Sequence, residues 1–283
     1  MLLVLDFCPC VFNIPIVEDA PMSTPLDDVD FLTRSEYRVA VLKALANEPH
    51  EYSELMDLTG VSRVTLSRML TQLEEKNWIV ENDQYEITPV GEDIAADLST
   101  LLETTELAQD LHDVIQWVPT TTMDFDLRRL AKAEIGTVTN NEPHKPLERA
   151  FALCEPASRS LYMGNGTSVS FARMAANKTP STDDRFEVIF SSSAIDTISD
   201  SPQSAAFHRE MIEQGWDIHE SEKTLPVSMG VYDSTVLILL VDENGTEQGF
   251  IESDDPVIRS WCEDTFERYR RESHPINTDT FVL

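Results

Sequence analysis

Hydrogen-bonding side chains are concentrated in a short stretch of the sequence between residues 62 and 72. An arginine can pair bidentately with guanine, a glutamine can pair with adenine, and serine or threonine hydroxyls can reach phosphates. Side chains of these types, projected from one surface, could read the major groove of double-stranded DNA. The candidate DNA-binding residues are Ser62, Arg63, Thr65, Ser67, Arg68 and Gln72.

The leucines between these residues predict how the polar side chains are presented. Leu66, Leu70 and Leu73 follow the i, i+4, i+7 spacing that lines one face of an α-helix. Ser62 is placed to cap the helix N-terminus, and Gly60 permits a sharp bend before it. With the leucines buried, the candidate DNA-binding residues must lie on the outer surface of this helix.

The flanking sequence predicts a three-helix core with a β-hairpin. The expected elements are helices at 31–47 and 51–59 and strands at 78–80 and 85–87, joined by the acidic loop 81–84. Ser35 is the expected cap of the first helix, and Asn47 and Pro49 are its stop signals. Together with the helix after Ser62, these elements predict a winged helix-turn-helix domain over residues 31–95.

This region resembles the winged-helix transcription regulators of archaea, near the MarR and ArsR families. The resemblance is carried by GVSRVTLSRMLTQLEEKNWI at Gly60 to Ile79 and by ITPVG at Ile87 to Gly91. It implies a DNA-binding regulator. The simpler alternative is an amphipathic helix in an ordinary helical domain, with Arg63 and Arg68 merely solvated.

The charge balance is the outstanding feature of the composition. The chain has 283 residues, a formal net charge of −30 and a pI near 4.3. Concentrated salt screens the self-repulsion of such a surface, so we interpret the composition as typical of a halophilic archaeal cytoplasm. The length favours two domains.

The acidic character extends into the predicted DNA-binding domain. Residues 33–95 contain twelve acidic and six basic residues by count from the sequence. DNA-binding domains are usually basic, because neutralising phosphates releases counterions. Attraction to DNA must then depend on local placement of the basic residues Arg34, Arg38, Arg63, Arg68 and Lys76.

The remaining composition favours a protein without metal, cofactor or membrane span. The four cysteines form neither a metal-binding pattern nor a disulfide framework, and no apolar run is long enough to cross a bilayer. A cytoplasmic location is expected. Residues 1–30 are expected to form a loosely ordered arm, and Met22 is an alternative start to Met1.

A long helix is predicted to follow the winged helix. Its apolar face runs from Thr88 and Pro89 toward Trp117, before a threonine-rich hinge at 120–122. We assign residues 96–127 to a linker or dimerisation helix. The helix could pack on the winged helix of its own chain, or pair with its twin in a homodimer, the usual state of such regulators.

The second half of the sequence alternates helical and strand patterns. The expected helices are 146–153, 168–176, 204–214 and 256–271, and the expected strands are 160–163, 186–190, 216–219, 226–232, 235–241 and 248–252. This alternation predicts an α/β sandwich over residues 128–273, followed by a tail at 274–283. The overall fold class is therefore α/β.

The second half resembles the C-terminal regulatory domain found behind winged helices in halophilic and methanogenic archaeal regulators. FEVIFS at 186–191, VYDSTVLILLVD at 231–242 and RSWCEDTFERYR at 259–270 carry the resemblance. It implies transcription regulation, with a sensor domain distantly related to the phospholipase-D fold. Enzymes of that fold need an H-x-K motif, which none of the six histidines begins. We therefore expect no enzymatic activity.

Two loops between a predicted strand and a following helix are candidate effector sites, because helix N-termini attract anions. Their residues are Asn165, Gly166 and Thr167 in one and Ser191 and Ser192 in the other. Turn geometry and capping explain the same residues without any ligand. Cys154 and Cys262 are expected to be inert packing residues. The alternative to a DNA-binding regulator is a sensor or scaffold whose winged helix binds protein.

Overall fold

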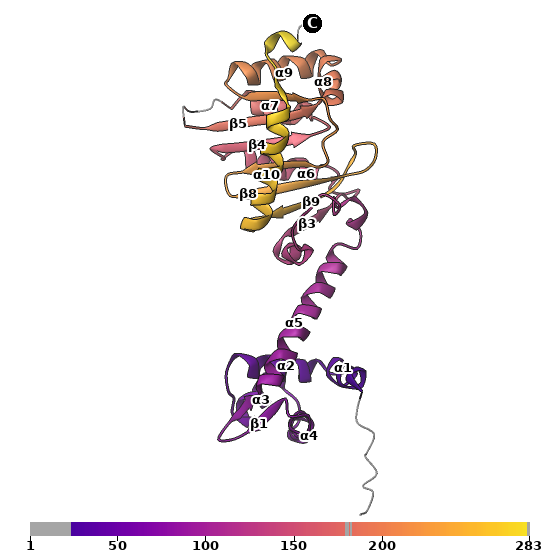
Figure 1. Ribbon diagram of the computed structural model, residues 1–283, viewed down its shortest axis with the longest axis vertical. Helices are drawn as coiled ribbons and strands as arrows, with labels where there is room; N and C mark the ends of the chain where they lie inside the picture. The colour runs from indigo at the N-terminus through magenta and orange to yellow at the C-terminus, as the bar shows by residue number, and fades with distance from the viewer. Residues whose placement is uncertain (1–23, 179–180, 182, 282–283) are drawn as a thin grey trace, which may run out of the picture. The chain divides into compact units, whose positions relative to one another are not determined.

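The computed structural model describes residues 24–178, 181 and 183–281, and the chain divides into two compact units after Thr100. Figure 1 shows a mainly helical first unit and a second unit built on a large sheet. The expected disorder of residues 1–23 and the choice between Met1 and Met22 lie outside the described residues. In the described part, no helix is long and apolar enough to cross a membrane.

The first unit contains short helices followed by a two-stranded antiparallel hairpin. Its elements are α1 (Pro25–Thr33), α2 (Glu36–Asn47), α3 (Tyr52–Thr59), α4 (Arg63–Glu75), β1 (Ile79–Glu81), β2 (Tyr85–Ile87) and the N-terminal part of α5 (Pro89–Asp110). The hairpin register pairs Ile79 with Ile87. The predicted helices and strands of this region are confirmed to within a residue or two. Ser35 lies at the N-cap of α2 as predicted, but its side chain makes no capping hydrogen bond, and residues 25–33 form a separate helix.

Helix α1 was not predicted, because residues up to 30 were assigned to an arm and the helical pattern from Phe31 was given its cap at Ser35. Thr24 accepts a hydrogen bond from the backbone N–H of Asp27, and the Asp27 carboxylate accepts one from the backbone N–H of Thr24. This capping box, with Pro25 in the first turn, begins a helix that buries Leu32. The Thr-Pro-Leu-Asp sequence was an overlooked start signal.

The predicted register of α4 is confirmed. Leu66, Leu70 and Leu73 are 1% exposed or less and lie in the core of the first unit. Ser62 caps the helix by accepting a hydrogen bond from the backbone N–H of Thr65 at 3.3 Å. Gly60 ends α3 in the left-handed region at φ 64°, the conformation that the bend requires.

Helix α5 ends at Asp110, seven residues before the predicted end at Trp117. A short 3-10 helix, η1 (Ile115–Trp117), follows it. Ala95 and Leu98 belong to the core of the first unit, and Leu111 and Val114 belong to a core of the second. The chain turns after Asp110, and this turn buries Leu111 and Val114 in the second unit. The helix end therefore depends on tertiary packing, which the periodicity of the sequence does not show.

The second unit is built on an eight-stranded mixed sheet in the order β10-β6-β5-β4-β7-β8-β9-β3 in the described part of the chain. Strands β4, β5 and β6 are parallel, and the other pairs are antiparallel. The strands are β3 (Glu134–Thr137), β4 (Arg159–Gly164), β5 (Arg185–Ser191), β6 (Asp217–Ser221), β7 (Ser228–Tyr232), β8 (Thr235–Val241), β9 (Glu247–Ser253) and β10 (His274–Pro275). The edge strands β3 and β10 were not predicted.

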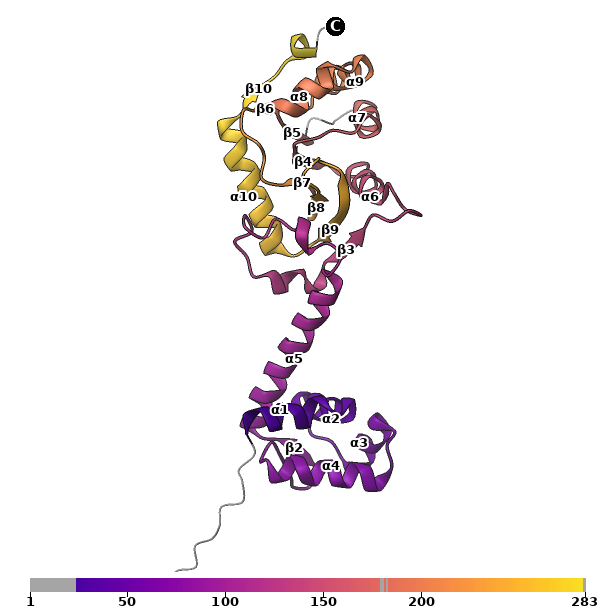
Figure 2. The same ribbon diagram turned by 90° about the vertical axis from the view of Figure 1, so that its right-hand side faces the viewer.

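Helices cover both faces of this sheet. Figure 2 shows α10 on one face and the other helices on the opposite face. The helices are α6 (Lys145–Cys154), α7 (Val169–Ala176), α8 (Ser192–Ser199), α9 (Pro202–Glu213) and α10 (Pro256–Glu272), with short turns η2 (Leu127–Lys132) and η3 (Thr278–Phe281). Along β5, Val188 and Phe190 pack in the core under α6–α9, whereas Ile189 packs in the core under α10. This alternation confirms the α/β class.

Candidate nucleic-acid interface and ligand pocket

The outer face of α4 presents five of the six predicted DNA-binding residues to solvent. Their side chains belong to Ser62, Arg63, Thr65, Ser67 and Arg68, all of them exposed. Within the described ranges, neither Arg63 nor Arg68 forms an ion pair with an acidic residue. These two guanidinium groups are therefore positioned to contact an external anion.

Two further basic side chains of the first unit, Arg34 and Lys76, have partners within the unit. Arg34 pairs with Asp30 at 2.8 Å, and Lys76 pairs with Asp28 while lying over the rings of Phe31 and Trp78. The expected attraction to DNA from Arg34 and Lys76 is thus weakened by neighbouring carboxylates.

Gln72, the sixth predicted residue, lies apart from the exposed row. It is half-buried, and its side-chain oxygen accepts a hydrogen bond from Arg38 Nη2 at 3.2 Å. Arg38 also stacks on the Phe31 ring, 4.0 Å from its centre, and donates to the Phe31 carbonyl. Partial burial beside Arg68 lowers the Arg38 pKa from its ordinary value. The amide oxygen of Gln72 therefore has a partner within the unit.

Replacing Gln72 with alanine should affect stability more than DNA binding. We expect the free energy of unfolding to fall by about 1 kcal/mol, because Arg38 loses a hydrogen-bond acceptor in a partly buried place. DNA affinity should change by less than about threefold. Urea unfolding and a DNA titration of the same variant check both values. A loss of affinity as large as that of Arg68→Ala would instead place Gln72 against a base.

The loop between β1 and β2 is acidic, as predicted. Glu81 ends β1, Asp83 lies in the loop, and the Asn82 amide donates to Glu86 at 3.3 Å. Burial, followed by interactions with Glu81, raises the pKa of Tyr85 to about 12, so its hydroxyl stays protonated. This loop offers no positive charge to a phosphate backbone.

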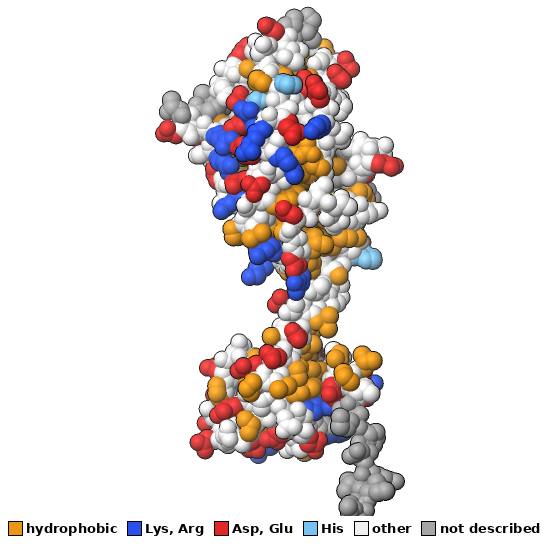
Figure 3. All heavy atoms as spheres, in the orientation of Figure 1, with side chains coloured by type: hydrophobic (Ala, Val, Ile, Leu, Met, Phe, Trp, Pro, Cys, Tyr) orange, Lys and Arg blue, Asp and Glu red, His pale blue; other side chains and the backbone are white. Residues whose placement is uncertain are grey.

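Basic side chains also gather on the second unit, over α10 (Figure 3). They alternate with acidic ones, and several of them form ion pairs with these neighbours. Arg270 and Arg185 both bind Glu187, Arg185 also binds Glu267 at 2.8 Å, and Lys223 binds Glu272 at 2.6 Å. We therefore do not assign this surface to an anionic partner.

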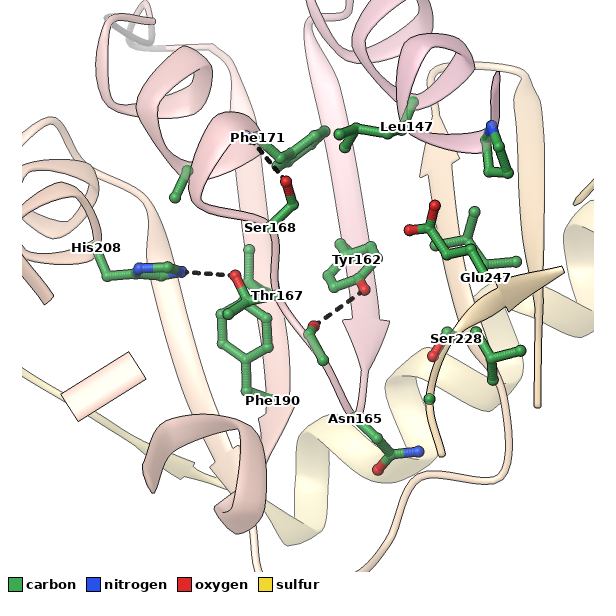
Figure 4. A pocket seen from close by; sticks show the side chains of 18 of the residues that line it. Leu147, Tyr162, Asn165, Thr167, Ser168, Phe171, Phe190, His208, Ser228 and Glu247 are labelled. Carbon is green, nitrogen blue, oxygen red and sulfur yellow. Dashed lines mark hydrogen bonds between the residues drawn. The ribbon is translucent and has the colours of Figure 1, made fainter. Parts of the chain in front are cut away.

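The second unit contains a pocket between the sheet and helices α6, α7 and α9. Its volume is about 150 Å³, and most of its walls are apolar or aromatic. Its lining includes Leu147, Tyr162, Phe171, Val188, Phe190, Met211, Tyr232 and Leu239, with the polar residues Asn165, Thr167, Ser168, His208, Ser228 and Glu247 (Figure 4).

The predicted loop 165–167 lies at this pocket. Both ends of the Asn165 amide are occupied, since it donates to the Leu225 carbonyl at 2.7 Å and accepts from the Leu225 N–H at 2.9 Å. The Gly166 carbonyl accepts from Tyr162 Oη at 3.4 Å, and Thr167 Oγ1 lies 3.2 Å from His208 Nε2. Asn165 therefore fixes the loop, whereas Thr167 borders the cavity.

Ser191 and Ser192 do not line the pocket. Ser191 is buried and its hydroxyl lies 3.0 Å from that of Ser193, and the Ser192 hydroxyl donates to the Ser221 carbonyl at 3.4 Å. The unpredicted helix α8 begins here, at Ser192. The two predicted loops are thus not brought together into one site.

Several pocket residues were missed by the sequence analysis. Tyr162, Phe171, His208, Tyr232 and Glu247 come from β4, α7, α9, β7 and β9. Their neighbours in the sequence carry no motif, and each is individually ordinary for a helix or strand. Only the folding of the sheet brings them together.

His208 is a buried histidine held by hydrogen bonds on both ring nitrogens. Its Nδ1 donates to the Ser204 carbonyl at 2.8 Å, so the neutral ring accepts the Thr167 hydroxyl at Nε2. Burial lowers its pKa from the ordinary value, and burial also lowers the pKa of His219. Protonation of these rings is therefore harder in the folded than in the unfolded chain.

We expect the second unit to lose stability as the pH falls below about 6.5, the ordinary histidine pKa, because the unfolded chain then binds more protons. The contribution of the histidines is complete above that pH. Thermal unfolding between about pH 7.5 and 5.5 measures the slope. His208→Gln should show a smaller slope, and an unchanged slope would remove His208 as its source.

Both described cysteines are buried, as expected for packing residues. Cys154 and Cys262 have no exposed surface, and burial raises the pKa of each thiol above its ordinary value. A low thiolate fraction makes both poorly reactive.

Comparisons with known proteins match the two halves separately. Residues 26–110 match the family model of the HVO_A0261 N-terminal domain. Residues 143–272 match that of the middle domain of methanogenesis regulatory protein FilR1, which confirms the predicted resemblance of the second half. No curated protein matches the chain.

Two solved structures show a distant likeness. TrmBL2, an archaeal chromatin protein described with a novel mode of DNA binding, is 12% identical, with 89% of this chain and 100% of that chain covered and a TM-score of 0.38. Nuc, a phospholipase D family member from Salmonella typhimurium, is 9% identical, with 52% and 98% covered and a TM-score of 0.41. Likenesses of this size say nothing about function.

Proposed function

We infer that the protein is a DNA-binding transcription regulator of archaeal type. Its first unit matches the HVO_A0261 N-terminal domain, and its second unit matches the FilR1 middle domain. The observation that carries this proposal is the outer face of α4. There, Arg63 and Arg68 stand exposed because Leu66, Leu70 and Leu73 are buried behind them.

The first unit would act as a winged helix-turn-helix. In this assignment α3, the bend at Gly60 and α4 form the helix-turn-helix, and the β1–β2 hairpin forms the wing. Helix α4 would enter the major groove, with its N-terminal residues toward the base edges. The acidic hairpin loop would contribute little, so α4 carries recognition.

The net charge of −30 supports a protein adapted to concentrated salt, as in halophilic archaea. Under such conditions, counterion release contributes little to the affinity of any DNA-binding protein. Sequence discrimination by base contacts would then matter more than overall positive charge. A net negative DNA-binding unit is compatible with this balance.

The test is a titration of the full chain with the DNA upstream of its own gene, at high salt, against a scrambled duplex of equal length. We expect the upstream DNA to bind at least about 100-fold more tightly than the scrambled duplex. Equal affinity for both would contradict sequence-specific regulation. Absence of DNA binding, with α4-dependent binding of another protein, would favour the scaffold alternative.

The second unit would supply the regulatory input through its pocket. A ligand changes the activity of such a protein only if it binds one conformation better than another. We propose that an effector in the pocket shifts the population of DNA-binding conformations. The chain has no H-x-K motif, so we assign this unit to sensing instead of phospholipase-type catalysis.

We propose that the protein is a homodimer, and that the exposed leucines of α5 contribute to its interface. Leu101 is 53% exposed and Leu102 is 39% exposed, in a helix that also carries the exposed Val90. The double variant Leu101→Glu, Leu102→Glu should raise the dimer dissociation constant by at least about tenfold, because charged groups replace apolar contacts. Sedimentation equilibrium measures the change, with Val90→Glu as the matched control. Unaltered association would exclude these leucines from the interface.

A further inference from the structure

Glu247 differs from the other shielded carboxylates of the second unit. Glu187 is bound by Arg185 and Arg270, and Glu252 is bound by Arg149. Glu247 is also partly buried, yet no residue in the described ranges donates a hydrogen bond to its carboxylate. Leaving a shielded carboxylate without a partner costs free energy, so this group is open to an external one.

The carboxylate of Glu247 faces the ligand pocket. Figure 4 shows it directed toward the space between Leu147 and Tyr162. Burial raises its pKa, and the nearby His144 opposes this shift. Among the lining residues that the structure describes, Glu247 is the one Asp, Glu, Lys or Arg.

The walls of the pocket are suited to an organic cation. Tyr162, Phe171, Phe190 and Tyr232 line it, and aromatic faces attract cations through their negative π-surface. The Phe171 ring lies 6.4 Å from that of Tyr162, and Phe190 lies 6.0 Å from Tyr162. The rings of Tyr162, Phe171 and Phe190 thus form one aromatic wall of the pocket.

The pocket lining that the structure describes offers no Lys or Arg to an anion. The Thr167 hydroxyl donates to His208, whose other nitrogen is bound to the Ser204 carbonyl. The Asn165 amide is occupied by Leu225. A carboxylate ligand would therefore meet a like charge at Glu247, with only neutral donors such as the Ser168 and Ser228 hydroxyls to offset it.

We propose that the pocket binds a small organic amine, with Glu247 as its counter-charge and the aromatic wall around its apolar group. A cavity of about 150 Å³ holds a single ring with a short substituent. This assignment rests on the proposed regulatory function, because it names the chemical class of the effector.

The test measures binding of three probes to the full chain by calorimetry. Benzylamine, benzyl alcohol and benzoate have similar shapes but positive, neutral and negative charge. We expect benzylamine to bind about tenfold more tightly than benzyl alcohol, with the weakest binding for benzoate. Glu247→Gln should bring the amine and the alcohol to equal affinity. Glu243→Gln, an exposed carboxylate on the same β-hairpin, should leave the preference intact.

Leu147→Trp supplies a second line of evidence. Leu147 is half-buried at the pocket wall, so a larger side chain should fill the cavity and abolish binding of all three probes while the chain remains folded. The inference is overturned if benzoate binds as well as benzylamine, if Glu247→Gln retains the amine preference, or if none of the probes binds at millimolar concentration. The DNA titration without any probe tests the proposed function separately, so the two failures are distinguishable.

Discussion

Replacing Arg63 and Arg68 together with alanine is expected to lower affinity for the upstream DNA by at least about 100-fold, because each bidentate contact is worth about 1–3 kcal/mol of discrimination. Both side chains are exposed on α4 and form no ion pair within the described ranges. Fluorescence anisotropy with labelled duplex, at two salt concentrations, measures the loss. The stability of the first unit should not change, since surface substitutions are usually near neutral.

Two further substitutions sharpen this result. Arg34→Ala removes an arginine that pairs with Asp30, and it should leave affinity nearly unchanged. Arg63→Lys with Arg68→Lys keeps the charge but loses the planar guanidinium fork, so it should retain binding to scrambled DNA and lose discrimination. If the double alanine variant bound as tightly as the natural chain, α4 would not be the recognition helix.

Gly91→Ala is expected to destabilise the first unit strongly. A Cβ atom at Gly91 would lie 2.0 Å from the Trp78 carbonyl oxygen and 2.8 Å from a side-chain carbon of Ile87. Trp78 precedes β1 and Gly91 is in the first turn of α5, so the close approach locks the hairpin to the helix. Overpacking against backbone cannot be relieved by a rotamer change, and about 2 kcal/mol or more should be lost.

The sign of this change is itself diagnostic. At an exposed helix position, glycine to alanine stabilises by about 0.5–1 kcal/mol. Here we expect the midpoint of thermal unfolding of the first unit to fall by about 10 °C. Calorimetry of the full chain measures it, with Ala96→Ser on the exposed side of α5 as the control. An unchanged or raised midpoint would show that the hairpin and α5 are not locked through this contact.

The secondary structure of the first unit was largely predictable, because the residues that determine it are neighbours in the sequence. The spacing of Leu66, Leu70 and Leu73 and the cap at Ser62 lie within one helix, so they determine which face is buried without knowledge of the rest of the chain. The position of Gln72 was not predictable in this way. Arg38, which donates a hydrogen bond to the Gln72 amide oxygen, lies 34 residues earlier in the sequence. The two side chains meet only when α2 and α4 pack together.

In the second unit, too, some elements were predictable from neighbouring residues and others were not. Buried strands such as β5 were predicted because they are rich in apolar residues, whereas the edge strands β3 and β10 are short and mostly polar or exposed. Helix α8 was missed because its serine-rich start is typical of a loop.

The sequence by itself determined the α/β class, the register of α4 and the acidic hairpin loop, since each follows from neighbouring residues. The tertiary structure decided the pocket, because Tyr162, His208 and Glu247 come from separate elements and meet only across the finished sheet. The tertiary structure also decided which charged side chains have an ion-pair partner. An ion pair depends on distance in space, and the sequence does not state that distance.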